Sequence, residues 1–206
     1  MTRAYPSLLA ATLLCGNLSA HAARPALAAV PDAPRITIDL AHGTPREETT
    51  KATLEQVLAS YDLKKYTFTR RVMIEERAIN HAFPVLTLNV RFASSPDELL
   101  SSYLHEQLHW HLRDHLPQQQ EAVAELRRMY PNAPDKMPEG ADGAYNTYGH
   151  LVDCYLEILA DRELIGAERT LAVVNDKGHY TWIYSTILKD EDRIAAVVNR
   201  HRLRVN

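Results

Sequence analysis

Two histidines and a glutamate stand in an order that can bind a metal ion and use it. His105, Glu106 and His109 form the pattern H-E-x-x-H. On a helix, residues four positions apart lie on one face about one turn from each other, so both imidazoles can bind one Zn²⁺. Glu106 lies beside them and can take a proton from a metal-bound water. The pattern therefore predicts a zinc site with general-base chemistry, and the alternative is a solvated polar helix face.

A catalytic zinc site usually needs a third protein ligand, and a downstream segment offers several. His150, Asp153, Glu157 and Asp161 lie within about 40° of one line along a helix that is otherwise apolar nearly all round. Buried carboxylates are unfavourable unless they are paired or bound to a metal. A metal on the facing helix would satisfy them, whereas the alternative is a line of surface salt bridges with Arg162 as a partner.

His115 is a further candidate for the third ligand, but its position argues against that role. The spacing of His105, His109 and His115 matches the metzincin pattern H-E-x-x-H-x-x-G-x-x-H, in which the glycine lets the chain turn back to the metal. Leu112 stands at the glycine position here. Without the turn the helix continues and carries His115 roughly 120° or more away from His109. We therefore expect His115 to pack or to lie on the surface.

The two motifs together resemble the gluzincins, the thermolysin-like zinc metallopeptidases. In that family a glutamate on a downstream helix is the third ligand, and an aspartate four residues later orients the first histidine. The resemblance implies that Glu157 binds the single zinc ion and that Asp161 holds His105. Asp153 or His150 in place of Glu157 remains the alternative. The implied fold is an α+β, zincin-like domain with a small twisted sheet, an active-site helix and a ligand-bearing helix downstream.

The resemblance also implies a Tyr or His donor opposite the metal, because attack on a carbonyl builds negative charge that a placed donor stabilises. We favour Tyr184 as this oxyanion donor, with His179 and His150 as further oxyanion or substrate contacts. Packing of these aromatic side chains in the core is the alternative. The other side chains of this kind near the two motifs are Tyr145, Tyr148 and Tyr180.

The elements that must position these residues follow from periodicity. Alternating hydrophobicity predicts strands at 35–40, 66–74 and 84–92. Helical periodicity, start signals and glycine or proline stops predict helices at 45–61, 96–116, 119–129, 147–165 and 180–203, the last one broken near Lys189. Strands that precede helices indicate an α+β fold. By analogy with zincins, residues 84–92 are placed to be an edge strand that pairs with extended substrate.

The N-terminus has the pattern of a secretory signal peptide. Arg3 supplies the positive charge, Leu8–Leu14 is a short apolar run, and Ala20–Ala22 offers an A-x-A cleavage site, with Ala26–Ala28 as a second choice. The apolar run is too short to span a bilayer as a helix. The expected organisation is a signal peptide at 1–22, an Ala/Pro-rich linker at 23–34 and a metallopeptidase domain at 35–206 of a periplasmic or extracellular protein.

Composition supports an ordinary globular domain. Of 206 residues, 46% are hydrophobic and 24% charged, and the net charge of −3 does not suggest a nucleic-acid binder. We expect no membrane span in the mature chain, where Cys154 alone cannot form an internal disulfide. The predicted activity is hydrolysis of a peptide or protein substrate. The alternative is a metal-binding or interaction protein without hydrolysis, although such a module needs the ligands and not the base Glu106.

Overall fold

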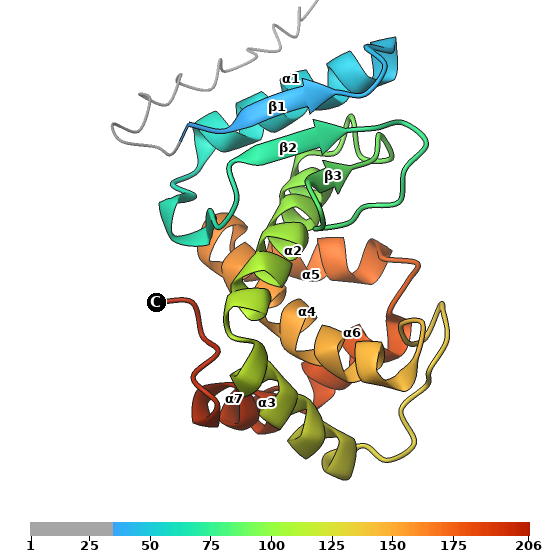
Figure 1. Ribbon diagram of the computed structural model, residues 1–206, viewed down its shortest axis with the longest axis vertical. Coiled ribbons are helices and arrows are strands. Elements are labelled where there is room, and N and C mark those ends of the chain that lie inside the picture. Colours follow the sequence, from blue (N-terminus) through green and yellow to red (C-terminus); the bar gives the residue numbers. More distant parts are fainter. Residues whose placement is uncertain (1–34) are drawn as a thin grey trace, which may run out of the picture.

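The computed structural model describes residues 35–206, so the predicted signal peptide and linker lie outside the described residues. Within this part of the chain, seven α-helices and a small three-stranded parallel sheet form a fold that is about 60% helical (Figure 1). The α+β class is therefore confirmed. No α-helix in residues 35–206 combines the length and the apolar character that a membrane crossing requires.

The sheet consists of three short strands. Its order is β1-β2-β3, and both pairs are parallel, so each pair needs a crossover connection. Helix α1 (Pro45–Ser60) supplies the first crossover, and a loop supplies the second. The observed strands are shorter than the alternating stretches predicted at 35–40, 66–74 and 84–92: β1 covers Thr37–Leu40, β2 Arg71–Ile74 and β3 Leu86–Leu88.

The outer edge of β3 is covered by the chain itself. Thr87 N–H donates to His81 O at 2.8 Å, and His81 N–H donates back to Thr87 O at 3.1 Å. Next to this pair, Asn89 N–H donates to the side-chain oxygen of Asn80 at 2.7 Å. The backbone groups that an extended substrate would need are therefore already bonded. The prediction that residues 84–92 form a free edge strand is wrong for this structure.

The helices follow the predicted order with one addition. The segment predicted at 180–203 is indeed broken, because two helices meet at Asp190. The addition is a short helix after Gly166, which ends the long preceding helix at a positive φ of 83° where glycine is favoured. The observed bounds are α2 Pro96–Asp114, α3 Leu116–Met129, α4 Ala144–Ile165, α5 Ala167–Asp176, α6 Thr181–Lys189 and α7 Glu191–Arg200.

Helix α2 is held between the sheet and α4 (Figure 1). Its N-terminal half packs under the sheet through Leu100 and Leu104, which are fully buried with Val72 of β2 and Leu86 of β3. Its C-terminal half joins an all-helical core around α4. Burial of these apolar side chains is the main stabilising term for both helices, at about 1.5–3 kcal/mol for each large side chain. It also fixes which face of α2 looks toward α4.

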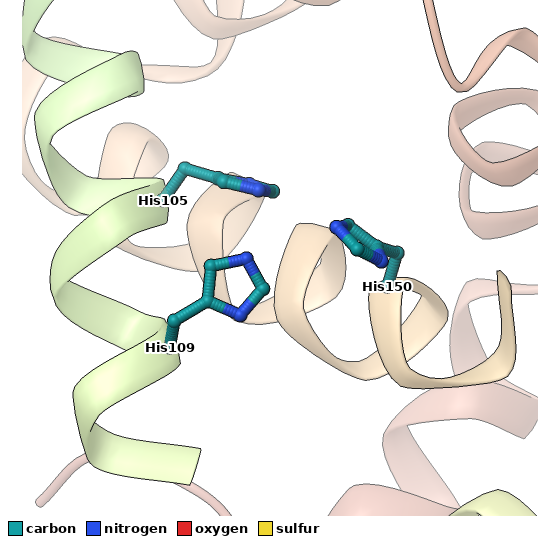
Figure 2. A group of neighbouring side chains, drawn as sticks. All are labelled: His105, His109 and His150. Carbon is teal, nitrogen blue, oxygen red and sulfur yellow. The ribbon is translucent and has the colours of Figure 1, made fainter. Parts of the chain in front are cut away.

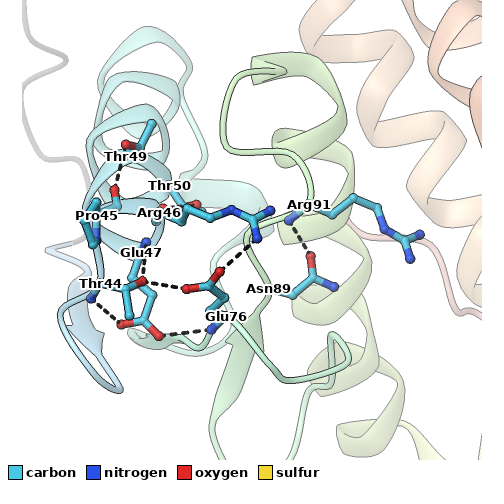
Figure 3. Close-up of polar contacts among 9 residues, drawn as sticks. All are labelled: Thr44, Pro45, Arg46, Glu47, Thr49, Thr50, Glu76, Asn89 and Arg91. Carbon is cyan, nitrogen blue, oxygen red and sulfur yellow. Dashed lines mark hydrogen bonds and ion pairs between the residues drawn. The ribbon is translucent and has the colours of Figure 1, made fainter.

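A buried carboxylate ties the start of α1 to the loop after β2 (Figure 3). Glu47 accepts backbone N–H bonds from His42 at 2.9 Å, from Thr44 at 3.3 Å and from Glu76 at 3.0 Å. The Thr44 hydroxyl in turn accepts from Glu47 N–H at 3.2 Å, which completes a capping box. Burial raises the pKa of Glu47, but these backbone donors outweigh burial and leave the pKa below its usual value.

Substituting Glu47 by Gln is expected to lower the free energy of unfolding at pH 7 by about 1–3 kcal/mol, because the amide brings donors against backbone N–H groups. Because the pKa of Glu47 is lower in the folded than in the unfolded protein, its carboxylate stabilises the fold at pH values above the unfolded pKa. The difference in free energy of unfolding between wild type and Glu47→Gln should therefore shrink as the pH falls below about 4.3. Urea denaturation at several pH values measures this free-energy difference, and the variant Glu48→Gln, at an exposed position of the same helix turn, is the matched control. Equal losses for both variants would contradict the expectation.

Candidate metal centre

Three histidines from two helices converge beside a cleft whose wall includes His105 of α2. His105 and His109 extend from α2, and His150 extends toward them from α4 (Figure 2). The ring centroids lie 4.8 Å apart for His105 and His109, 5.5 Å for His105 and His150, and 5.2 Å for His109 and His150. One nitrogen of each ring lies within 4.8 Å of a nitrogen of each of the others, so the three could hold a metal ion.

Hydrogen bonds prepare two of these rings for metal binding. His150 Nδ1 lies 2.8 Å from the carbonyl oxygen of Asn146, and His105 Nδ1 lies 2.9 Å from Glu157 Oε2. Both partners can only accept, so in each ring Nδ1 carries the proton that is donated. In a neutral ring the lone pair is then on Nε2, where a metal can use it. Burial lowers the pKa of His105, but the carboxylates of Asp153 and Glu157 outweigh burial and raise the pKa well above its usual value, so His105 must release its Nε2 proton to bind an ion. Burial, together with the charges of His105 and His109, lowers the pKa of His150 to about 4, which keeps this ring neutral.

Asp153 completes the group with a carboxylate that lacks hydrogen bonds. Its side chain is fully buried, with Oδ2 2.9 Å from His105 Nδ1 and 3.6 Å from His109 Nε2. Neither oxygen has a hydrogen-bond partner among the described residues. A buried carboxylate without donors is costly unless a cation lies beside it. The three imidazoles are ligands that suit a divalent ion of the zinc type, and the charge of this nearby carboxylate favours a cation among them.

Glu157 lies one turn further along α4 and is already fully bonded. Oε1 accepts from Ser101 Oγ at 2.6 Å and from Lys177 Nζ at 2.5 Å. Oε2 accepts from Tyr184 OH at 2.9 Å and from His105 Nδ1 at 2.9 Å. Burial raises the pKa of Glu157, but the Lys177 ammonium and the His105 ring hold the pKa well below its usual range. Glu157 thus holds the Nδ1 proton of His105 and lies outside the His105–His109–His150 group. It belongs to a second set, with His105 and Cys154, whose ligand atoms also lie within 4.8 Å of one another and could hold an ion.

Asp161 does not occupy the position predicted for it. The resemblance implied that Asp161 holds His105, but the carboxylates that contact His105 are those of Asp153 and Glu157. Asp161 lies one further turn along α4, fully buried, and both of its oxygens are without hydrogen-bond partners among the described residues. Burial and the charge of Glu157 raise the pKa of Asp161 to about 8. At neutral pH it is therefore a neutral acid behind the site.

Glu106 lies in the wall of the cleft, only 4% exposed, next to the two α2 histidines. Burial raises the pKa of Glu106 to about 7, and the negative charges of Asp153 and Glu157 add to this effect against the opposing charge of His105. A carboxyl group of this kind, next to a candidate metal centre and open to a cavity, can exchange a proton with a molecule bound there.

The cleft itself has a volume of about 450 Å³. His105 and Glu106 of α2 lie in its wall, and connecting segments supply most of the rest. The contributing residues are Ala78–Asn80 before β3, Asn89, Arg91 and Phe92 after it, and Lys177–Tyr180 between α5 and α6. A cleft of this volume can hold a few residues of a polypeptide, or a small molecule.

Tyr184 does not line this cleft, which does not fit the predicted oxyanion-donor role. Its side chain is buried, and its hydroxyl donates to Glu157 behind the histidines. Tyr180 lies in the cleft instead, with its ring centroid 4.5 Å from that of His150. Tyr180 also has a left-handed backbone, with φ 55°, which is uncommon for a residue other than glycine and is a feature enriched at functional sites. His179 lines the cleft, as expected for a substrate contact.

The remaining candidates lie away from the metal centre. His115 caps the C-terminus of α2, with its Nδ1 2.8 Å from the carbonyl oxygen of His111 and outside the histidine group. Tyr148 is buried and donates to the carbonyl of Tyr130, and Tyr145 is exposed. The expectation that the helix continues past Leu112 and turns His115 away is therefore confirmed.

Sequence reasoning missed Lys177, which lines the cleft and neutralises Glu157. Its segment, Asn175–Gly178, carries no metal or catalytic pattern, so only the tertiary contact reveals it. Tyr180 was weighed but not favoured, and the His-Tyr pair before a helix was its only signal.

Comparison with known proteins gives no match. No protein-family model, curated protein or solved structure matches this chain.

Proposed function

We propose that this chain is a zinc-dependent hydrolase that cleaves peptide bonds, on a zincin-like fold. The observation that carries the proposal is the H-E-x-x-H face of α2, which lies beside a cleft and meets His150 and the buried carboxylate of Asp153, whose oxygens accept no hydrogen bond from the described residues. The same residues that would hold the ion leave Glu106 next to it in the cleft wall. This combination of ligands, base and cavity is what metal-assisted hydrolysis requires.

In this proposal His105, His109 and His150 hold the ion, and Asp153 balances its charge from the buried side. Glu157 keeps the Nδ1 proton of His105 in place and so orients the ring. The third ligand would then lie on the same helix as Glu157, the ligand implied by the gluzincin resemblance, but about two turns earlier. The ion would supply Lewis-acid chemistry, which activates a water molecule and polarises a carbonyl group.

Glu106 would act as general base and then as general acid. It would accept a proton from the attacking water and donate it to the leaving amine. Tyr180 is our candidate for a donor to the developing oxyanion, because its ring lines the cleft and no described residue forms a hydrogen bond with its hydroxyl. The signal-like N-terminal sequence supports action outside the cytoplasm, in a periplasmic or extracellular space.

The ligand assignment predicts a specific order of zinc affinities. His150→Ala should weaken zinc binding by more than the 10–100-fold or so that loss of an orienting partner costs, whereas Glu157→Gln should remain near that range. Competition with a chromogenic chelator measures both. His179→Ala is the matched control, since this histidine lines the cleft outside the group. Loss of zinc in Glu157→Gln, with affinity kept in His150→Ala, would instead restore Glu157 as the ligand.

The function is tested by cleavage profiling of a broad peptide library with the zinc-loaded protein and mass-spectrometric detection. We expect cuts that disappear with a chelator and return when zinc is added back. Zinc binding without any cleavage of the library would contradict the peptidase proposal.

A further inference from the structure

One arginine in the cleft wall has no partner in the described part of the chain. Arg91 follows β3 and lines both the cleft beside His105 and an adjoining cavity of about 300 Å³. Its guanidinium forms no ion pair or hydrogen bond with any residue in 35–206, and only its backbone N–H is bonded. Figure 3 shows the side chain extending away from the polar cluster that holds its backbone. Its charge is therefore available to a bound molecule.

The backbone under this arginine is fixed. Arg91 N–H donates to Asn89 Oδ1 at 2.9 Å, and Asn89 N–H donates to Asn80 Oδ1 at 2.7 Å. Val90 between them is buried in the core under the sheet. Positioning the backbone lowers the entropy that is lost when the side chain engages a ligand.

The other charged residues around the cleft, including Glu106 in the same wall, form no ion pair with Arg91. Lys177 is the second cation in the wall, but its ammonium is paired with Glu157 at 2.5 Å. Glu98 and Asp176 border only the adjoining cavity, and neither forms an ion pair with Arg91. On the side of His105, Arg91 is thus the only cation among the lining residues that is not already paired, apart from the histidines.

A guanidinium offers parallel N–H donors that match the two oxygens of a carboxylate. Apolar side chains accompany it at the mouth of the cleft: Ile79 is 84% exposed and Met137 is 45% exposed. We infer that Arg91 binds a carboxylate of the substrate and so selects anionic peptides. This inference rests on the proposed function and specifies its substrate class. The carboxylate can come from a free C-terminus or from an acidic side chain.

Direct binding tests this inference without turnover. The zinc-loaded Glu106→Gln protein is titrated into three fluorescein-labelled peptides that differ only in charge: one with a free C-terminus, one amidated with a Glu, and one amidated with Gln in its place. Fluorescence anisotropy should show about tenfold tighter binding of at least one anionic peptide than of the neutral one. Which anionic peptide gains identifies the source of the carboxylate.

Adding Arg91→Gln to this protein should abolish the preference, whereas Arg77→Gln should keep it. Arg77 is an exposed arginine of the neighbouring loop that does not line the cleft. Equal affinity for all three peptides, no binding of any, or a preference that survives Arg91→Gln would overturn the inference. Cleavage by the wild-type protein is scored separately. Equal cleavage of neutral and anionic peptides refutes the role of Arg91 alone, and selective binding without cleavage refutes only the peptidase proposal.

Discussion

Changing Glu106 to Gln is expected to reduce kcat/KM for peptide hydrolysis by about 10²–10⁴-fold, the usual contribution of a positioned general base. Gln has nearly the same volume, so packing in a wall position that is 4% exposed is preserved. The amide cannot take up a proton, so the loss should fall mainly on kcat. Zinc affinity should change little, because Glu106 is not one of the grouped ligand side chains.

The measurement compares single-turnover cleavage of one library-derived peptide by both proteins at equal zinc occupancy. Asp114→Asn is the matched control, since this exposed acid ends the same helix and does not line the cleft. If Glu106→Gln retained wild-type kcat, Glu106 would not be the base. If both proteins bound zinc and neither cleaved, the chain would be better described as a metal-binding protein.

The shared face of His105 and His109 on α2 could be predicted from sequence because it depends on local geometry alone. A helix fixes the relation between His105 and His109 through its own period, and the apolar stripe of Leu100, Leu104 and Leu108 fixes which face is buried. The same argument turned His115 away from His105 and His109, as the structure shows. The helical period thus determines on which side of a helix a given side chain lies.

The α4 residue that lies closest to both His105 and His109 could not be predicted in the same way, because its identity depends on where two helices cross. The positions of His150, Asp153, Glu157 and Asp161 indicate which face of α4 is turned toward α2, but not which turn of α4 lies opposite His105 and His109. That turn depends on residues distant in sequence. Lys177 and Tyr184 form hydrogen bonds with Glu157, and His150, about two turns earlier on α4, lies beside His105 and His109. The covered edge of β3 has a similar cause, since the pairing of His81 with Thr87 depends on the path of a loop.

Lys177→Met is expected to destabilise the protein by about 3–5 kcal/mol, the usual cost of removing one partner of a buried ion pair. The Lys177 side chain is 10% exposed and the Glu157 side chain is fully buried, so water cannot replace the lost ammonium. Adding Glu157→Gln should recover much of this loss, because the uncompensated charge is then gone. Urea denaturation with a chelator present measures the free energies of unfolding without a contribution from bound metal.

Lys65→Met provides the matched control for this pair. Lys65 also binds a glutamate of α4, Glu163, but the two side chains are 34% and 52% exposed, so the loss should be only about 0–1 kcal/mol. Equal losses for the two lysines would mean that the Lys177–Glu157 pair is hydrated in solution. A double variant no more stable than Lys177→Met would mean that the lysine acts through its packing and not its charge. Recovery in the double variant would instead support Lys177 as the charge that keeps Glu157 ionised behind His105.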